Sequence, residues 1–450
     1  MTSSLKLWLL FDIATDKISK FEFVYLCSVK RIAFHTFGCK LNFAETSSIS
    51  RNLDPLSFEI TDFRKEADVY VVHSCMVTAA AERKTIGAIR QAHRRNPSAA
   101  IIVIGCMAEL QKEGLFNEAG VQAVIGNEQK FDLEKILSGV SEKPEDQKPF
   151  TFRPSWSVHE RTRSFLKIQD GCDYFCAYCT IPLARGRSRS GTIAEILQAA
   201  RTITEAGAKE IVLTGVNIGD FGRHHHESLY PLLVQLHHIE GLERIRISSI
   251  EPDLLNADII RLAADQGKLL PHFHIPLQSG SDRVLELMKR RYKTALFAEK
   301  VDLIKSILPE ACIATDVITG FPGESEEDHL NSCHFIQNIP LSYMHVFTYS
   351  ERRNTLALKR SDIVPLTIRK ERSMALHQLS EAKKKVFYEG NANAQRTAFF
   401  ESANKKGFIF GFTENYIRVR HPWNQRLINK ILPVRLTDFA TSDYFDVELI

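Results

Sequence analysis

The sequence predicts an α/β protein in three parts: an open parallel α/β domain, a partial (β/α)6 barrel and a small C-terminal β-barrel. Three observations predict this architecture. Near the start, Val/Ile-rich runs without polar alternation, typical of buried parallel strands, alternate with helical patterns. Six β-then-α units follow, and short strand patterns fill the end of the chain. The length of 450 residues agrees with about three domains of roughly 150 residues each.

The first predicted domain covers residues 31–140 and contains the open parallel sheet. Helical patterns separate its strand patterns, as expected when helices connect parallel strands. The expected strands are residues 31–37, 69–74, 100–104 and 123–125, and the expected helices are residues 81–95 and 131–137.

Two segments flank this domain without belonging to it. Residues 1–30 show no clean period, so we expect an extension that is not native, with the true start near Val29 and no role for Cys27. Residues 141–157 are charged, contain three prolines and have no period, which predicts a linker.

Three cysteines of the first domain occupy equivalent places. Cys39, Cys75 and Cys106 each follow a predicted strand. Because the carboxyl ends of parallel strands lie along one edge of a sheet, we expect the three thiols to converge there. A single strand-end cysteine is more often a core residue, but three at matching positions favour a metal site.

The second predicted domain covers residues 158–388 and repeats a strand followed by a helix. Such repeats predict a parallel, right-handed, barrel-like sheet that six units close only in part. The expected strands are residues 165–169, 210–213, 244–248, 272–276, 313–318 and 344–349. The expected helices are residues 194–206, 229–238, 253–264, 282–290, 296–307 and 326–337.

The most specific local signal is the cysteine triplet Cys172, Cys176 and Cys179, spaced C-x3-C-x2-C after the first barrel strand. Active sites of such barrels lie at this end of the strands. Zinc usually requires four ligands, and this loop has no fourth Cys or His. Iron–sulfur clusters bind thiolates, and three cysteines leave one cluster iron open for a substrate or cofactor.

Other barrel strands end in segments rich in Gly, Pro and polar residues. By itself each segment is more easily explained as a turn, but their common position beside the cysteine loop favours a ligand site. These segments are residues 213–217, 248–252, 276–281 and 318–325. Arg185, Arg187 and Arg189, just after the cysteine loop, suit phosphate or carboxylate binding about as well as a solvent-exposed loop.

The third predicted domain covers residues 389–450, after a helix expected at residues 366–387. Its strands, at residues 396–401, 408–411, 416–420, 430–436 and 444–449, predict a small β-barrel of the kind often used for nucleic acid. Residues 381–435 contain 11 basic and 4 acidic side chains, which indicates an anionic partner. Aromatic and basic residues that suit stacking on unpaired bases are Phe410, Phe412, Tyr416, Trp423, Lys405, Lys406, Arg418 and Arg420.

Composition excludes several classes of protein. Apolar residues make up 44% of the chain and charged residues 25%, values that exclude wholesale disorder. No run approaches the roughly 20 apolar residues of a membrane helix. The longest apolar run near the start, residues 7–11, is too short for a signal-peptide core of about 7–15 residues, so we expect a cytoplasmic protein. Nine cysteines, an odd number, favour metal or redox use over a disulfide framework.

Motifs along most of the chain resemble the radical S-adenosylmethionine (SAM) methylthiotransferases. They are TFGCKLN, HSCMVTAAAERK, IGCMAE, IQDGCDYFCAYCTIPLARGRSRS, LTGVNIGDFG, HIPLQSGSDRVLELMKR and TGFPGE. Lys40, GVNIGDFG and ENYIRV are most similar to the members that act on threonylcarbamoyladenosine in tRNA. The resemblance implies a radical SAM barrel and a C-terminal TRAM domain that binds RNA, and it does not include residues 1–30.

The resemblance also implies two [4Fe-4S] clusters and bound SAM. Cys172, Cys176 and Cys179 would hold the cluster that cleaves SAM, and Cys39, Cys75 and Cys106 would hold the auxiliary cluster that carries the sulfur. Tyr178 would lie near the adenine, and Gly320, Pro322 and Gly323 would border SAM. One SAM would methylate the sulfur and a second would provide the radical that removes hydrogen from adenine C2. The implied partners are a tRNA anticodon stem-loop and a reduced flavodoxin or ferredoxin-type electron donor.

Three alternatives are kept open. Two retain the chemistry but change the substrate, to isopentenyladenosine in tRNA or to an aspartate of a ribosomal protein. The third is a non-enzymatic RNA-binding protein in which the two cysteine groups bind structural zinc with borrowed ligands.

Overall fold

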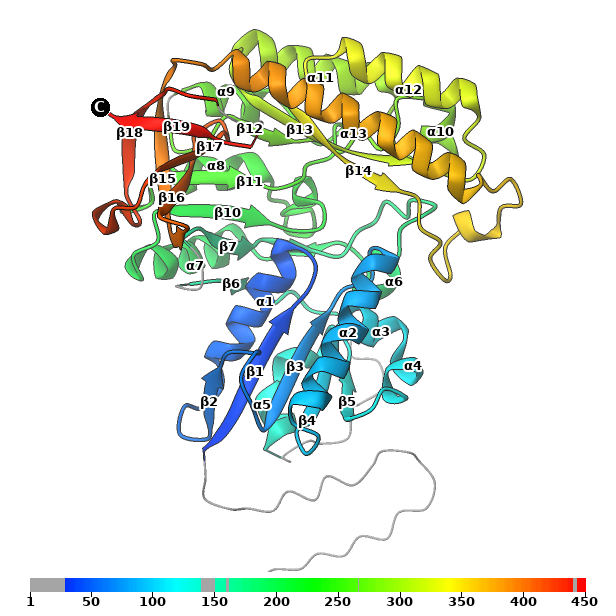
Figure 1. The fold of residues 1–450 in the computed structure, drawn as a ribbon, viewed down its shortest axis with the longest axis vertical. Helices are drawn as coiled ribbons and strands as arrows, with labels where there is room; N and C mark the ends of the chain where they lie inside the picture. Colours follow the sequence, from blue (N-terminus) through cyan, green and yellow to red (C-terminus); the bar gives the residue numbers. More distant parts are fainter. Residues whose placement is uncertain (1–28, 139–149, 159–161, 266, 440–442) are drawn as a thin grey trace, which may run out of the picture.

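The N-terminal part of the chain forms an open parallel sheet covered by helices, drawn from blue to cyan in Figure 1. The computed structural model describes residues 29–138, 150–158, 162–265, 267–439 and 443–450. The sheet has the order β2-β1-β3-β4-β5, and all its neighbours pair in parallel. Its strands are β1 (Lys30–Thr36), β2 (Phe58–Thr61), β3 (Val69–Ser74), β4 (Ala100–Gly105) and β5 (Val121–Ile125).

The helices of this sheet connect its strands, and two of them begin at or next to a cysteine. They are α1 (Lys40–Arg51), α2 (Ala79–Arg95), α3 (Cys106–Leu110), α4 (Lys112–Phe116) and α5 (Leu133–Leu137), with a 3-10 turn at Gln129–Asp132. Strand order reverses between β1 and β3. In open α/β sheets, ligands bind outside the carboxyl ends of the strands at such a reversal.

The predicted open sheet is confirmed, together with its four expected strands, but β2 and helix α1 were not predicted. Helix α1 cannot be predicted from apolar residues at helical spacing, because much of its buried side is polar, including Asn42, Glu45 and Ser47. A helix usually buries an apolar stripe, and this one instead faces polar partners in the next domain.

The central part forms the predicted partial barrel. Parallel strands pair in the orders β11-β10-β7 and β12-β13-β14, and an isolated bridge from Ile245 to Leu269 connects the two sets. A short antiparallel strand, β6 (Ser155–Trp156), extends the sheet beyond β7. The parallel strands are β7 (Ser164–Lys167), β10 (Glu210–Thr214), β11 (Arg244–Ile247), β12 (His272–His274), β13 (Cys312–Thr319) and β14 (Tyr343–Thr348).

Helices follow the barrel strands as expected and cover the outside of the sheet (Figure 1). They are α7 (Ile193–Glu205), α8 (Leu229–Leu236), α9 (Ala257–Ala264), α10 (Asp282–Leu287), α11 (Thr294–Ile307) and α12 (Glu326–Asn338). One continuous apolar cluster fills the space between sheet and helices. The cysteine loop lies between the short strands β8 (Gln169–Asp170) and β9 (Arg189–Ser190), together with helix α6 (Ile181–Arg185).

A long helix, α13 (Leu366–Glu389), leads to the predicted C-terminal β-barrel, which is closed in the order β15-β16-β17-β19-β18. The strands are β15 (Gln395–Lys405), β16 (Phe408–Thr413), β17 (Arg418–Pro422), β18 (Ile431–Leu436) and β19 (Phe445–Leu449). This barrel packs on the starting ends of the central strands, because Arg244 at the start of β11 donates to the carbonyl oxygens of Thr397 and Phe412 at 2.7 and 3.2 Å.

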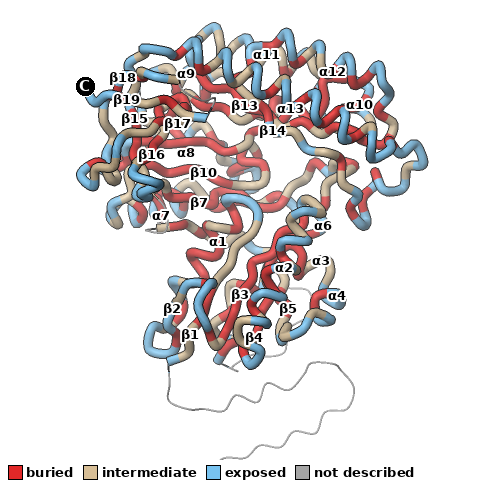
Figure 2. The backbone as a smooth tube through the Cα atoms, in the orientation of Figure 1, coloured by how far each residue is buried: buried red, intermediate tan, exposed pale blue. Residues whose placement is uncertain are grey.

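The most buried residues lie in the strands of the sheets, beneath the helices that cover them. Figure 2 shows the sheet strands in red, while the hairpin that joins β15 to β16 is pale blue and exposed. Within the residues that the structure describes, no helix is long and apolar enough to cross a membrane. Residues 1–28, with Cys27, and residues 141–149 of the expected linker lie outside the described residues.

Candidate active site

Cys39, Cys75 and Cys106 lie together at the carboxyl edge of the N-terminal sheet. Cys39 caps α1 after β1, Cys75 follows β3, and Cys106 starts α3 after β4. Gly38 brings the first loop onto the second: its φ is +99°, and a Cβ at this position would lie 2.9 Å from the Sγ atom of Cys75. Burial, with smaller contributions from Cys39 and Cys106, raises the pKa of Cys75 to about 12.

Cys172, Cys176 and Cys179 also lie together, in the loop after β8. The backbone N–H groups of Tyr174 and Ile181 donate to the Sγ atoms of Cys172 and Cys179, each at 3.4 Å. Burial raises the pKa of both thiols to about 12, and Cys176 adds to the shift. Neutral thiols of this kind release their protons when they bind a metal.

A cation from outside the loop completes this second group. The Nη1 atom of Arg290 donates to the Sγ atom of Cys176 at 3.1 Å, and its Nη2 atom pairs with Glu251. Burial disfavours the charged guanidinium, but Tyr178 and Glu251 hold the pKa of Arg290 well above its usual value. Hydrogen bonds to sulfur and nearby charge are the features that tune iron–sulfur clusters in proteins.

The expected SAM-bordering residues lie next to this loop. The ring of Tyr178 meets that of Phe321 edge-on, with centroids 6.3 Å apart. Phe321 is part of the segment Gly320–Gly323 that follows β13. Gly320 has a φ of +74°, and a Cβ there would lie 2.3 Å from the Cγ atom of Arg369 on α13. Close packing on α13 thus explains the glycine, and it holds the segment beside Tyr178.

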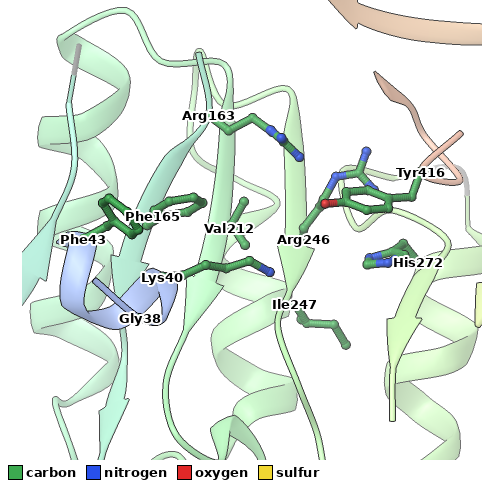
Figure 3. Close-up of a pocket in the computed structure, with 10 residues that line it drawn as sticks. All are labelled: Gly38, Lys40, Phe43, Arg163, Phe165, Val212, Arg246, Ile247, His272 and Tyr416. Carbon is green, nitrogen blue, oxygen red and sulfur yellow. The ribbon is translucent and has the colours of Figure 1, made fainter. Parts of the chain in front are cut away.

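A cavity of about 220 Å³ lies beside the first cysteine group (Figure 3). Residues of all three domains line it. They are Gly38, Lys40, Phe43, Arg163, Phe165, Val212, Arg246, Ile247, His272 and Tyr416. Gly38 and Lys40 flank Cys39 in the sequence, so the cavity borders the loop that carries this thiol.

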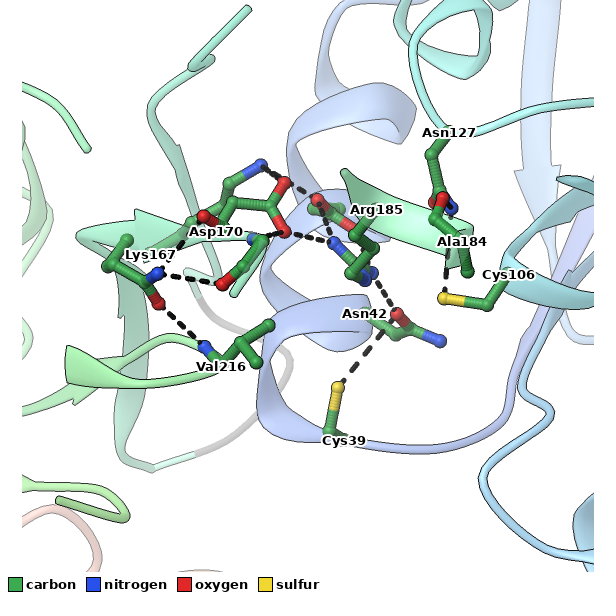
Figure 4. A network of polar contacts seen from close by, with 12 residues as sticks. Cys39, Asn42, Cys106, Asn127, Lys167, Asp170, Ala184, Arg185 and Val216 are labelled. Carbon is green, nitrogen blue, oxygen red and sulfur yellow. Dashed lines mark hydrogen bonds and ion pairs between the residues drawn. The ribbon is translucent and has the colours of Figure 1, made fainter. Parts of the chain in front are cut away.

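A buried polar network connects the first cysteine group to the start of the loop that carries the second (Figure 4). Arg185 is its centre: Nη2 donates to the Oδ1 atom of Asn42 at 2.6 Å, and Nη1 donates to the Oδ1 atom of Asp170 at 2.9 Å. Asn42 in turn accepts from the Sγ atom of Cys39 at 3.9 Å. On the other side, Asn127 donates to the Sγ atom of Cys106 at 3.7 Å.

Each carboxylate of the network has more than one cationic partner, so positive charges outnumber negative ones. Glu45 accepts from Arg185, from Lys130 at 2.6 Å and from Lys167 at 2.8 Å. Asp170 also pairs with Arg189 at 2.8 Å. Burial by itself would raise the pKa of Glu45, but the cations lower it well below its usual value. The surplus of positive charge complements thiolates at the cysteine groups, where such charge stabilises the ionised sulfur.

The network contains residues that sequence reasoning missed. Glu45, Lys130 and Asn127 drew no functional hypothesis, and Arg185 was weighed only as an anion-binding or solvent-exposed residue. The structure shows Arg185 1% exposed and fully paired with protein groups. The available signal was Lys167 within an apolar strand pattern, because a charged residue at such a position needs a buried partner.

Comparisons with known proteins agree with this geometry. Residues 31–126 match the model of "Uncharacterized protein family UPF0004", and residues 166–336 match that of the "Radical SAM superfamily". Each matched region contains one of the two cysteine groups.

Two curated relatives and one solved structure are similar over most of the chain. Threonylcarbamoyladenosine tRNA methylthiotransferase MtaB of Aquifex aeolicus is 38% identical, covering 87% of this chain and 96% of the relative. The MtaB protein of Bacillus subtilis is 36% identical, covering 90% and 93%. The fold resembles a radical SAM methyltransferase, TsrM, of Kitasatospora setae, solved with tryptophan and a SAM analogue. That TM-score is 0.53 at 12% identity, over 71% of this chain and 73% of the other. The chain therefore belongs to the radical SAM methylthiotransferase family of enzymes.

Proposed function

We propose that this enzyme adds a methylthio group to C2 of N6-threonylcarbamoyladenosine, the base next to the anticodon of tRNA. One observation carries the proposal: two groups of three cysteine thiols lie at strand ends, and a buried polar network connects Cys39 and Cys106 of the first group to Asp170, just before the loop that carries the second. Relatives with matching length that are named threonylcarbamoyladenosine tRNA methylthiotransferases support the choice of substrate.

The donor sets fit two [4Fe-4S] clusters, because each offers three thiols and leaves one iron for another ligand. Cys39, Cys75 and Cys106 would hold the auxiliary cluster. The SAM-binding cluster would be held by Cys172, Cys176 and Cys179, and SAM would be bordered by Tyr178, Gly320, Pro322 and Gly323. When bound, these groups supply radical hydrogen abstraction together with the sulfur and the methyl group that are transferred.

The protein's own contribution is to position the reacting groups and to keep water out. Arg185 contacts residues of both domains, so the two cysteine groups are held at a fixed separation. Its partner Glu45 is completely buried, as is Lys130, which also pairs with Glu45, and this makes the boundary rigid and dry. Correct placement of reactants is a large part of the rate enhancement that an enzyme supplies.

The C-terminal barrel would bind the RNA as a TRAM domain, within a proposed division into residues 31–140, 158–388 and 389–450. Lys405 and Lys406 are exposed on its hairpin. Close by, the guanidinium of Arg418 lies 4.6 Å from the ring centre of Phe410. Cations beside aromatic rings suit an unpaired anticodon loop. A reduced flavodoxin or ferredoxin-type protein would supply electrons, in the cytoplasm.

The test is mass spectrometry of tRNA nucleosides from a deletion strain of the host. We expect the 2-methylthio form of threonylcarbamoyladenosine to disappear and the unmethylthiolated form to accumulate. The wild-type gene should restore the product, whereas the Cys172→Ala and Cys39→Ala genes should not. A Cys312→Ala gene is the matched control, because this buried cysteine lies in β13, outside both groups.

Other results would assign other substrates. Loss of 2-methylthio-isopentenyladenosine, with the threonylcarbamoyl product intact, would make that base the substrate. Loss of a methylthio-aspartate from a ribosomal protein would move the activity to protein. Anaerobically purified protein that contains zinc without iron or sulfide would contradict the cluster assignment.

A further inference from the structure

The cavity of Figure 3 has features that point to a ligand with a negative charge. It lies where the three domains meet: Lys40 comes from the N-terminal domain, Arg246 and His272 come from the barrel, and Tyr416 comes from the C-terminal domain. Figure 3 shows Lys40 extending toward the group formed by Arg246, His272 and Tyr416.

Two of the cavity's cations are already paired within the protein. Arg246 donates to the Oε1 atom of Glu210 at 2.8 Å and to the carbonyl oxygen of Thr413 at 2.7 Å. Arg163 donates to the Oε1 atom of Glu401 at 3.2 Å and lies 4.5 Å from the ring centre of Phe412. These side chains therefore shape the wall and add positive potential.

Lys40 differs from both. Among the residues that the structure describes, its ammonium group has no hydrogen-bond acceptor and no carboxylate partner. Lys40 is an exposed residue, so its ammonium group, with three donors, is open to a ligand that enters the cavity lined by Phe43 and Phe165. An anionic ligand would supply the missing acceptor.

His272 provides a second, independent indication. The residue is 5% exposed, its ring stacks on Tyr416 with centroids 4.2 Å apart, and neither ring nitrogen has a hydrogen-bond partner. Burial lowers the pKa of His272 well below its usual value, and Arg246 and Lys40 lower it further, so the ring is neutral. A buried neutral imidazole with both nitrogens unpaired lacks the bonds that such groups almost always make.

We propose that this cavity recognises the threonyl part of the substrate base, with Lys40 binding its carboxylate and His272 bonding its hydroxyl group. This inference rests on the proposed function, whose substrate is the threonylcarbamoyl base. It deepens that function by naming the residues that distinguish this base from unmodified adenosine and from bases with apolar substituents. Proximity to the Cys39 loop would place the base beside the first cysteine group.

The experiment compares binding of three anticodon stem-loop RNAs to the reconstituted holoenzyme without reductant. One RNA carries threonylcarbamoyladenosine, one carries the methyl ester of its carboxylate, and one carries unmodified adenosine. We expect the wild type to bind the first RNA about ten- to a hundredfold more tightly than the other two, the range for one hydrogen bond to a charged group. The phosphates are common to all three RNAs, so they do not contribute to this ratio.

Four variants assign the effect. Lys40→Met should remove the preference without changing the affinity for unmodified RNA, and Lys40→Arg should retain much of it. His272→Phe keeps a ring on Tyr416 but removes both nitrogens, and should lower the preference several-fold. Lys370→Met, at an exposed site on α13, is the matched control and should behave as the wild type.

The outcomes separate this inference from the proposed function. A preference that survives in Lys40→Met and His272→Phe overturns the inference and leaves the function intact. If the wild type binds all three RNAs equally while the deletion strain lacks the methylthio product, the inference is likewise overturned and the function stays intact. A deletion strain that keeps the product overturns the function itself. Lys40 follows Cys39 directly, so Lys40→Met is also checked for its iron content. If that content is lower than in the wild type, the binding preference of His272→Phe decides the inference, because residue 272 is remote from the cysteines in sequence.

Discussion

Glu45 of helix α1 and Arg185 of the cysteine loop form a completely buried, two-point ion pair across the boundary between the N-terminal domain and the barrel. The Oε1 atom of Glu45 lies 3.1 Å from Nη1 of Arg185, and its Oε2 atom lies 3.0 Å from Nη2. Lys130 and Lys167 also pair with Glu45. One carboxylate therefore balances cations from both domains.

Replacing Glu45 by Ala should strongly destabilise the protein. Removal of one partner of a buried ion pair leaves uncompensated charge and typically costs about 3–5 kcal/mol of unfolding free energy. Urea unfolding, followed by circular dichroism, measures this change. Glu371→Ala, at an exposed site on α13, is the control and should change the unfolding free energy by less than about 0.5 kcal/mol. Equal midpoints for the two variants would contradict the structural role of Glu45.

The same carboxylate should contribute to acid sensitivity. The pKa of Glu45 is held well below its usual value of 4.5 in the folded protein, because Arg185, Lys130 and Lys167 surround the carboxylate. Its stabilising contribution is therefore present above about pH 4.5 and is lost as the pH falls toward the lowered pKa. In Glu45→Gln, the dependence of unfolding free energy on pH below 4.5 should be weaker than in the wild type, by up to about 1.4 kcal/mol per pH unit. Parallel curves for the two proteins would show that Glu45 does not titrate as the structure requires.

The contrast between the strands and this ion pair explains what could be predicted from the sequence. Strands such as β3, with the residues VYVVHS, are apolar and buried, so composition alone locates them. The convergence of Cys39, Cys75 and Cys106 was also predictable, because every parallel strand ends at the same edge.

The burial of helix α1 and of Arg185 could not be predicted from the sequence, and the physical reason is the same for both. Arg185 is buried because it meets Glu45, which lies 140 residues away in the sequence, and Glu45 is buried for the same reason. Neither residue alone has a local pattern that indicates burial, since charged residues are normally exposed. Similarly, the unpaired nitrogens of His272 become visible only when residues of three domains surround the ring.

Iron analysis should separate the two cysteine groups. Anaerobically reconstituted wild type should contain about eight irons, two [4Fe-4S] clusters, and each triple Cys→Ala variant should contain about four. Residues 172, 176 and 179 form one variant, and residues 39, 75 and 106 form the other. The Cys312→Ala variant should keep the full content. A wild type with about four irons, all lost from the first variant, would leave the auxiliary cluster without support.

Substitution of Arg290 by Met should make the SAM-binding cluster harder to reduce. The guanidinium donates to the Sγ atom of Cys176 at 3.1 Å, and positive charge near a cluster favours its reduced, more negative state. A loss of about 1 kcal/mol of this preference lowers the one-electron potential by roughly 40 mV. Redox titration followed by electron paramagnetic resonance measures the shift. Arg291→Met, whose guanidinium lies over the ring of Tyr174, is the neighbouring control. A potential unchanged from that of the wild type would show that the bond to Cys176 does not tune the cluster.

Removing the charges of Lys405 and Lys406 should weaken tRNA binding and reduce its dependence on salt. Both side chains are exposed on the hairpin between β15 and β16, and Lys405 lies 5.9 Å from the ring centre of Phe410. Each phosphate contact contributes about 0.7 to the slope of log K against log salt for single strands. The double substitution to Ala should therefore lower the magnitude of that slope by about 1.4 if both lysines contact phosphate. Titrations across a series of KCl concentrations measure it, with Lys370→Ala as the control. A slope equal to that of the control would place the RNA on another face of the C-terminal barrel, because loss of two phosphate contacts cannot leave counterion release unchanged.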